Sequence, residues 1–184
     1  MLPSAASLKQ TGGREFDRIV FDEQTIAARV RELGRAITAA YPEGELVVLC
    51  LLKGSFIFLS DLVRRIERPL QVDFLVAASY GRDTISSGNV RLLYDPETEL
   101  RGKHILLVED IVDTGKTLNR LVTLLRERDP KSLEICALLH KHVAEELVLE
   151  PRLVGFDAPR VFLVGYGLDH AENFRHLPYI ASLS

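Results

Sequence analysis

The segment that decides the fold reads ILLVEDIVDTGKTL and spans residues 105–118. An apolar run leads into the acids Glu109, Asp110 and Asp113, and residues 114–117 (TGKT) follow before a new apolar pattern begins. An apolar strand, a glycine-containing turn and a helix commonly direct backbone N–H groups at an anion. The segment therefore predicts a strand, a phosphate-binding turn and a helix, with carboxylates beside the turn.

The ending GKT is similar to that of the nucleotide-binding P-loop, but a P-loop requires a glycine five positions before Gly115. That position is Asp110. A carboxylate adds charge and bulk where the P-loop curls bare backbone around phosphate. We therefore expect a ligand that carries phosphate together with groups that bind acids, such as hydroxyls, a metal ion or a ring N–H.

Apolar runs alternate with helical spacing along the rest of the chain. Strands are predicted at 46–52, 72–78, 90–95, 105–108, 133–139 and 160–166, and helices from Thr25 to about Tyr41, from Ser55 to about Ile66, and from Leu118 to Asp129. This alternation predicts an α/β fold with a mostly parallel twisted sheet flanked by helices. Residues 1–16 are predicted to form a loose arm, and residues 79–89 an exposed mobile loop.

Composition limits the class of protein. A chain of 184 residues, 47% of them hydrophobic, fits a single domain. It has neither a long uncharged apolar run nor a basic start followed by an apolar core, so we expect no membrane span and no secretory signal. Cys50 and Cys136 lie in apolar runs, which fits a reducing cytoplasm. The formal charge of −3 argues against nucleic-acid binding.

Ligands of such sheets bind beyond the carboxyl ends of the strands. Residues able to bind a polar ligand follow four predicted strands: Lys53-Gly54, residues 109–117, Lys141 and Asp169. We expect these four segments to converge.

Residues 105–118 resemble the phosphoribosyl-pyrophosphate motif of the type I phosphoribosyltransferases, in which an apolar strand runs into two acids and a Thr-Gly loop. Four further segments carry the resemblance to one branch of that family: LLKGS at 51–55, SYG at 79–81, LLHK at 138–141 and VFLVGYGLDHAENFRHLPYI at 161–180. From about residue 15 onward, the chain is similar to the hypoxanthine-guanine phosphoribosyltransferases of purine salvage.

The resemblance implies a pentosyl (glycosyl) transferase. Such enzymes join hypoxanthine or guanine to phosphoribosyl pyrophosphate, form IMP or GMP, and release pyrophosphate with the help of Mg²⁺. The resemblance also implies a type I phosphoribosyltransferase fold, with a core at about 38–158 and a small hood from about 1–37 and 159–184. It further implies a cytoplasmic homodimer or homotetramer.

The same resemblance implies roles in binding the ribose and the 5-phosphate. Glu109 and Asp110 would accept hydrogen bonds from the ribose hydroxyls, directly or through magnesium waters. Residues 113–117 would enclose the 5-phosphate with backbone N–H groups and threonine hydroxyls. Asp113 matches the general base near N7 of the purine. The implied set is Glu109, Asp110, Asp113, Thr114, Gly115, Lys116 and Thr117.

Pyrophosphate would be held by the backbone of Lys53 and Gly54 and by the guanidinium of Arg175, whose planar fork suits phosphate oxygens. In the family loop the peptide that corresponds to Leu52-Lys53 can be cis. Asp169 matches a ligand of a second magnesium ion. The implied metal ligands are therefore Glu109, Asp110 and Asp169.

Recognition of the base would fall to Lys141, Phe162, Leu163 and Asp169. The Lys141 ammonium would donate to O6 of a 6-oxopurine, whereas adenine presents an amino donor at that position. Phe162 would stack on the ring, and the backbone carbonyls of Leu163 and Asp169 would meet N1–H and the 2-amino group. Residues 79–89, led by Ser79 and Tyr80, would form a lid that excludes water.

Ordinary structural readings compete with several of these roles. Glu109 and Asp110 also fit a solvated strand end, and Phe162 also fits a core position. Asp169 and Arg175 also fit an exposed ion pair. The pair His140 and His142 is too small for a structural zinc site, so we expect both rings to be exposed.

Two other classes of function stay open from the sequence. A regulator with this fold would bind RNA or DNA, but it would need a basic face that the charge balance does not provide. An ATP-using P-loop enzyme is the second, and Asp110 argues against it.

Overall fold

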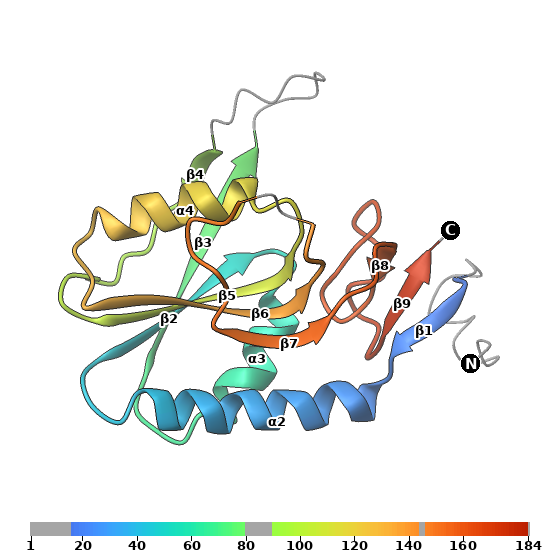
Figure 1. Cartoon of the computed structure of the whole chain (residues 1–184), viewed down its shortest axis with the longest axis horizontal. Coiled ribbons are helices and arrows are strands. Elements are labelled where there is room, and N and C mark those ends of the chain that lie inside the picture. The colour runs from blue at the N-terminus through green and yellow to red at the C-terminus, as the bar shows by residue number, and fades with distance from the viewer. Residues whose placement is uncertain (1–15, 80–89, 144–145, 184) are drawn as a thin grey trace.

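The computed structural model describes residues 16–79, 90–143 and 146–183. A six-stranded sheet forms its centre, and a separate three-stranded sheet stands beside it (Figure 1). The strands are β1 (Arg18–Phe21), β2 (Leu46–Leu52), β3 (Gln71–Ser79), β4 (Val90–Tyr94), β5 (His104–Val112), β6 (Ser132–His140), β7 (Leu153–Asp157), β8 (Phe162–Val164) and β9 (Ile180–Leu183). The helices are α2 (Glu23–Ala40), α3 (Phe56–Val63) and α4 (Lys116–Arg126).

The central sheet has the strand order β4-β3-β2-β5-β6-β7. Every neighbouring pair is parallel except β3 and β4. The predicted α/β fold with a mostly parallel sheet is therefore confirmed. β5 lies at the centre of the sheet and continues four residues beyond the apolar run, because its pairing with β6 persists through Val112. Glu109 and Asp110 thus belong to the strand itself.

Helices cover both faces of this sheet (Figure 1). α2 and α3 bury apolar side chains against one face, which includes Val48, Cys50 and Leu106. α4 packs on the opposite face, against residues such as Leu49 and Leu107. Alternate residues of one strand point to opposite faces, so a strand buried on both sides must be apolar throughout, as residues 46–52 and 105–108 are. Burying each such leucine or valine contributes about 1.5–3 kcal/mol.

The helix starts refine the predicted boundaries. α2 begins two residues before Thr25, because Asp22 caps it by accepting a hydrogen bond from the Thr25 backbone N–H at 2.7 Å. Ser55 occupies the N-cap position of α3 as predicted, but its side chain makes no capping bond. None of the helices in residues 16–79, 90–143 and 146–183 is long and apolar enough to cross a bilayer.

The three-stranded sheet has the order β1-β9-β8 and forms the hood. β1 pairs antiparallel with β9, so Arg18 lies opposite Ser182. The strand predicted over 160–166 is confined to β8 and pairs within the hood. Phe16 is buried in an apolar cluster beneath this sheet, so the predicted loose arm is wrong for that residue. Residues 1–15 lie outside the described part of the chain.

Strands β1, β7 and β9 were not predicted. All three are short, and β7 contains Gly155, which weakens the sequence pattern of a strand. A Cβ at Gly155 would lie 2.4 Å from the carbonyl oxygen of Leu138 on the adjacent strand. The close approach of the two backbones therefore explains the glycine.

Candidate active site

The ends of β2 and β5 meet the hood loop that follows β8. A Cβ added to Gly54 would lie 1.5 Å from Oδ2 of Asp110. A Cβ added to Gly167 would lie 2.0 Å from the carbonyl oxygen of Gly54. The three segments are packed so closely that neither glycine position has room for a side chain. The Leu52-Lys53 peptide, which precedes Gly54, is cis.

The two acids of β5 are poorly solvated. Oε2 of Glu109 is buried and has no hydrogen-bond partner among the described residues. Burial, with a further contribution from the charge of Asp110, raises the pKa of Glu109 well above its usual value. Asp110 accepts a hydrogen bond from the Ile111 backbone N–H at 2.8 Å. Burial nevertheless raises the pKa of Asp110 to about 6. A solvated strand end does not have these properties, whereas a site that awaits hydroxyls or a cation does.

Burial of Asp110 has a consequence for stability. Between its ordinary pKa of 3.8 and about 6, the folded state keeps a proton that the unfolded state has lost. The contribution of Asp110 to the free energy of unfolding should therefore fall as pH rises through this window. We expect Asp110→Asn to remove that loss and to raise the free energy of unfolding at pH 7 by about 1–3 kcal/mol.

Urea unfolding of both proteins between pH 4 and pH 7 measures this effect. Asp129→Asn is the matched control, because Asp129 is an exposed aspartate just before β6, at the opposite end of the strands from Asp110. Equal pH slopes in wild type and Asp110→Asn would contradict the expectation.

The turn after β5 has the form of an anion site. Gly115 adopts a left-handed φ of 76° immediately before α4, a conformation that favours glycine. A cavity of about 130 Å³ is lined by Glu109 and residues 111–118. It therefore opens onto the first turn of α4, where backbone N–H groups are unpaired by the helix. Lys116 is exposed and forms no ion pair with another described residue.

Lys141 connects this turn to the next strand of the sheet. Its Nζ lies 3.0 Å from Oδ2 of Asp113, and its backbone N–H donates to the Val112 carbonyl. The Lys141 side chain is 14% exposed and that of Asp113 is 47% exposed. A cation and a carboxylate thus lie side by side at the ends of β5 and β6.

The hood loop contributes a second group of charges. Arg175 forms an ion pair with Asp169 at 2.7 Å and donates to the Gly167 carbonyl at 2.8 Å. Nε of Arg175 is buried and has no hydrogen-bond partner in residues 16–79, 90–143 and 146–183. Lys53 and Arg175 both contact Glu172, a residue whose sequence context predicted no role. The contact with Lys53 joins the hood loop to the end of β2.

The predicted base-binding residues of β8 have contrasting environments. Phe162 is 51% exposed and contacts the His170 ring edge-on, with a centroid separation of 5.4 Å. The core reading of Phe162 is therefore wrong. Leu163 is buried. Ser79 ends β3, and the rest of the predicted lid, residues 80–89, lies outside the described residues.

The two histidines that flank Lys141 differ from the expectation that both are exposed. His140 is 6% exposed, because β6 extends to this residue, and its ring lies 3.9 Å from that of His142 between centroids. His142 is exposed as expected and its Nε2 lies 2.5 Å from Oδ1 of Asp157.

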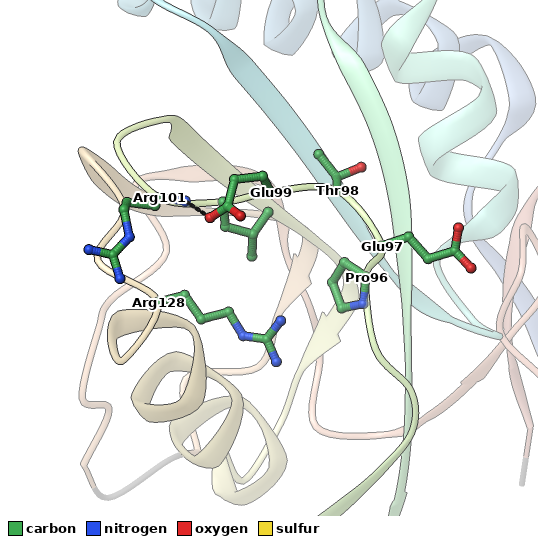
Figure 2. A pocket seen from close by; sticks show the side chains of 7 residues that line it. Pro96, Glu97, Thr98, Glu99, Arg101 and Arg128 are labelled. Carbon is green, nitrogen blue, oxygen red and sulfur yellow. Dashed lines mark hydrogen bonds between the residues drawn. The ribbon is translucent and has the colours of Figure 1, made fainter.

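A larger cavity, of about 340 Å³, lies elsewhere, between the loop before β5 and the end of α4. Figure 2 shows its lining residues: Pro96, Glu97, Thr98, Glu99, Leu100, Arg101 and Arg128. Arg128 is paired with Asp95 and Arg101 with Asp129. Both arginines of this cavity are therefore already paired with carboxylates of the protein.

A model of the phosphoribosyl transferase domain family matches residues 18–171. The chain belongs to this family. Among curated relatives, it is 46% identical over 169 residues to the hypoxanthine-guanine phosphoribosyltransferase of Dictyostelium discoideum, covering 90% of this chain and 94% of the relative. It is 44% identical over 167 residues to the hypoxanthine phosphoribosyltransferase of Salmonella typhimurium, with the same coverage.

A solved structure gives the same assignment. The hypoxanthine phosphoribosyltransferase of Staphylococcus aureus superposes with a TM-score of 0.88 at 39% identity, covering 92% of each chain. The match to the phosphoribosyltransferase family thus covers the central sheet and strands β1 and β8.

Proposed function

We propose that this phosphoribosyltransferase transfers the ribose 5-phosphate of phosphoribosyl pyrophosphate to hypoxanthine or guanine, forming IMP or GMP. The observation that carries the proposal is the 3.0 Å contact between Lys141 and Asp113, beside the acids of β5 and the turn of α4. A 6-oxopurine has an acceptor, O6, next to N7. A neighbouring ammonium and carboxylate match that edge of the ring, and the amino group of adenine does not match the ammonium.

The proposed reaction uses the chain's own groups in fixed roles. N9 of the base bonds to C1 of the ribose as the bond from C1 to the pyrophosphate oxygen breaks. Asp113 takes up or shares the proton at N7 and stabilises the positive charge that develops. Glu109 and Asp110 accept hydrogen bonds from the ribose hydroxyls, and the turn at 113–117 binds the 5-phosphate.

Pyrophosphate would leave along Lys53, Gly54 and Arg175. Planar guanidinium donors suit its oxygens, and the buried, unpartnered Nε of Arg175 is a donor still in need of an acceptor. Phe162, half exposed at the edge of the hood, offers a face for stacking on the purine, and the carbonyls of Leu163 and Asp169 would accept from N1–H and the 2-amino group. Residues 79–89, with Ser79 and Tyr80, would close over the ligands.

The carboxylates fit Mg²⁺. Hard oxygen donors are what this ion prefers, and Oε2 of Glu109 is buried and unpartnered. The described residues contain no cluster of three or more metal-binding side chains, which suits an ion that takes much of its coordination from water and substrate phosphates. Glu109 and Asp110 would hold one ion, and Asp169 would hold a second. When bound, Mg²⁺ would offset the charge of the pyrophosphate as it leaves.

Further expectations follow from family membership. We propose a homodimer or homotetramer that works in the cytoplasm and binds neither nucleic acid nor membrane. The formal charge of −3 supports the absence of a broad nucleic-acid surface.

A panel of bases tests the proposed function. The protein is mixed with phosphoribosyl pyrophosphate, Mg²⁺ and, in turn, hypoxanthine, guanine, xanthine or adenine, and nucleotide formation is followed by absorbance and chromatography. We expect product from hypoxanthine, guanine or both, at a rate at least about 100-fold above that with adenine. No product from any of the three oxopurines would refute the proposal.

A further inference from the structure

The carboxylate of Glu172 lies between two cations of the proposed pyrophosphate site. Its Oε2 is 3.1 Å from Nζ of Lys53 and 3.4 Å from Nη2 of Arg175. The two cations come from different parts of the fold, the end of β2 and the hood loop, and the same oxygen contacts both. The Glu172 side chain is 65% exposed, so it lies at the mouth of the site rather than within the core.

A tight turn fixes the position of Glu172. His170 and Asn173 exchange backbone hydrogen bonds, at 3.2 and 3.1 Å, around the two residues between them. Those residues, Ala171 and Glu172, have φ values of 50° and 63°. Two consecutive left-handed residues are typical of a type I′ turn. The Glu172 backbone N–H also donates to Oδ2 of Asp169 at 2.9 Å.

The backbone of this turn is costly for residues other than glycine and asparagine. Neither Ala171 nor Glu172 suits it. A strained turn that nevertheless carries a charged side chain toward two cations indicates that the side chain has a use.

The local charges keep Glu172 ionised. The hydrogen bond and charge of Lys53, with a smaller contribution from Arg175, lower the pKa of the Glu172 carboxyl. At neutral pH the free protein therefore holds an anion between the two cations.

We propose that Glu172 is a built-in competitor of pyrophosphate: its carboxylate occupies Lys53 and Arg175 in the free enzyme, and the phosphate oxygens must displace it to bind. The inference rests on the proposed function, because it assigns these cations to pyrophosphate. Exposed ion pairs are weak, so a diphosphate with several negative oxygens is able to displace the carboxylate. Return of the carboxylate then favours release of the product.

The variant Glu172→Gln tests this competition. It removes the charge and keeps the size of the side chain. The dissociation constant for pyrophosphate, measured by calorimetry in the presence of Mg²⁺, should fall about 3- to 10-fold, because two weak exposed pairs are lost. The gain should shrink in high salt, which screens exposed charges. The affinity for IMP should be unchanged, because a nucleoside monophosphate does not reach these cations. Glu172→Asp, with a shorter reach, should give an intermediate value.

Glu32→Gln is the matched control. Glu32 also pairs with an arginine three residues away, and its side chain is 52% exposed, but it lies on α2, outside the site. We expect it to leave the pyrophosphate affinity at the wild-type value.

The possible results separate the inference from the function on which it rests. If wild type binds pyrophosphate but Glu172→Gln binds it no more tightly, Glu172 does not compete with pyrophosphate. The proposed function is then unaffected. An equal gain in affinity for pyrophosphate and IMP overturns it as well, since that result indicates a general rearrangement. Wild type that binds IMP but no pyrophosphate refutes the assignment of the site itself.

Discussion

Asp113→Asn is expected to lower turnover about 100- to 10,000-fold, the usual contribution of a general base, while the affinity for phosphoribosyl pyrophosphate changes little. Asparagine keeps an oxygen that accepts the Lys141 bond, now 3.0 Å long, so the local geometry should survive. It has no charge to stabilise the developing cation and no basic oxygen to take the N7 proton. Steady-state kinetics with hypoxanthine, combined with direct binding of phosphoribosyl pyrophosphate, measure the two effects separately.

Asp129→Asn provides the comparison, because it makes the same chemical change at an exposed position just before β6, at the opposite end of the strands from Asp113. If Asp113→Asn weakened binding and turnover by the same factor, Asp113 would be a binding residue. If it altered neither, the proposed base would be wrong.

Gly54→Ala is expected to lower kcat/KM for phosphoribosyl pyrophosphate by at least about 100-fold, because a displacement of about 1 Å near the reacting groups is enough for such a loss. The new methyl carbon would lie 1.5 Å from Oδ2 of Asp110, which is the length of a covalent bond. Asp110 or the loop at Lys53 and Gly54 must therefore move. Overpacking of this kind also costs about 1–3 kcal/mol of stability.

Kinetics and thermal unfolding are measured on the same samples. They distinguish a distorted site in a folded protein from a protein that no longer folds. Gly102→Asn is a suitable control, since a Cβ at Gly102 meets nothing within 4 Å and asparagine tolerates its left-handed φ of 72°. If Gly54→Ala kept the wild-type kcat/KM, the close contact between Gly54 and Asp110 would not be needed for activity.

Much of the central sheet could be predicted from the sequence because its strands are buried on both faces. The run at 46–52 coincides with β2, residue for residue. The apolar run at 105–108 predicts β5 but not where this strand ends. The reason is that Glu109, Asp110 and Asp113 interrupt the apolar pattern that marks a strand. The pairing of β5 with β6, which no local pattern contains, carries the strand through those acids.

The hood was harder to predict, for a physical reason. β1 and β9 pair across almost the full length of the described chain, and neither has a long apolar pattern of its own. The same holds for Glu172. Its significance depends on Lys53, which is 119 residues away in sequence, and on a turn whose left-handed residues are not the usual glycine or asparagine. Only the resemblance to the family drew attention to the surrounding residues.

The location of β5 between β2 and β6 has a consequence for the entropy of binding. Glu109 and Asp110 lie on a strand hydrogen-bonded on both sides through its buried part, so little of their freedom is left to lose when a sugar binds. Asp169, Glu172 and Arg175 lie instead on a loop whose ion pairs must exchange. Most of the conformational entropy lost on ligand binding is therefore lost in the hood. Rigidifying the hood loop in its bound conformation would raise the affinity more than rigidifying the sheet.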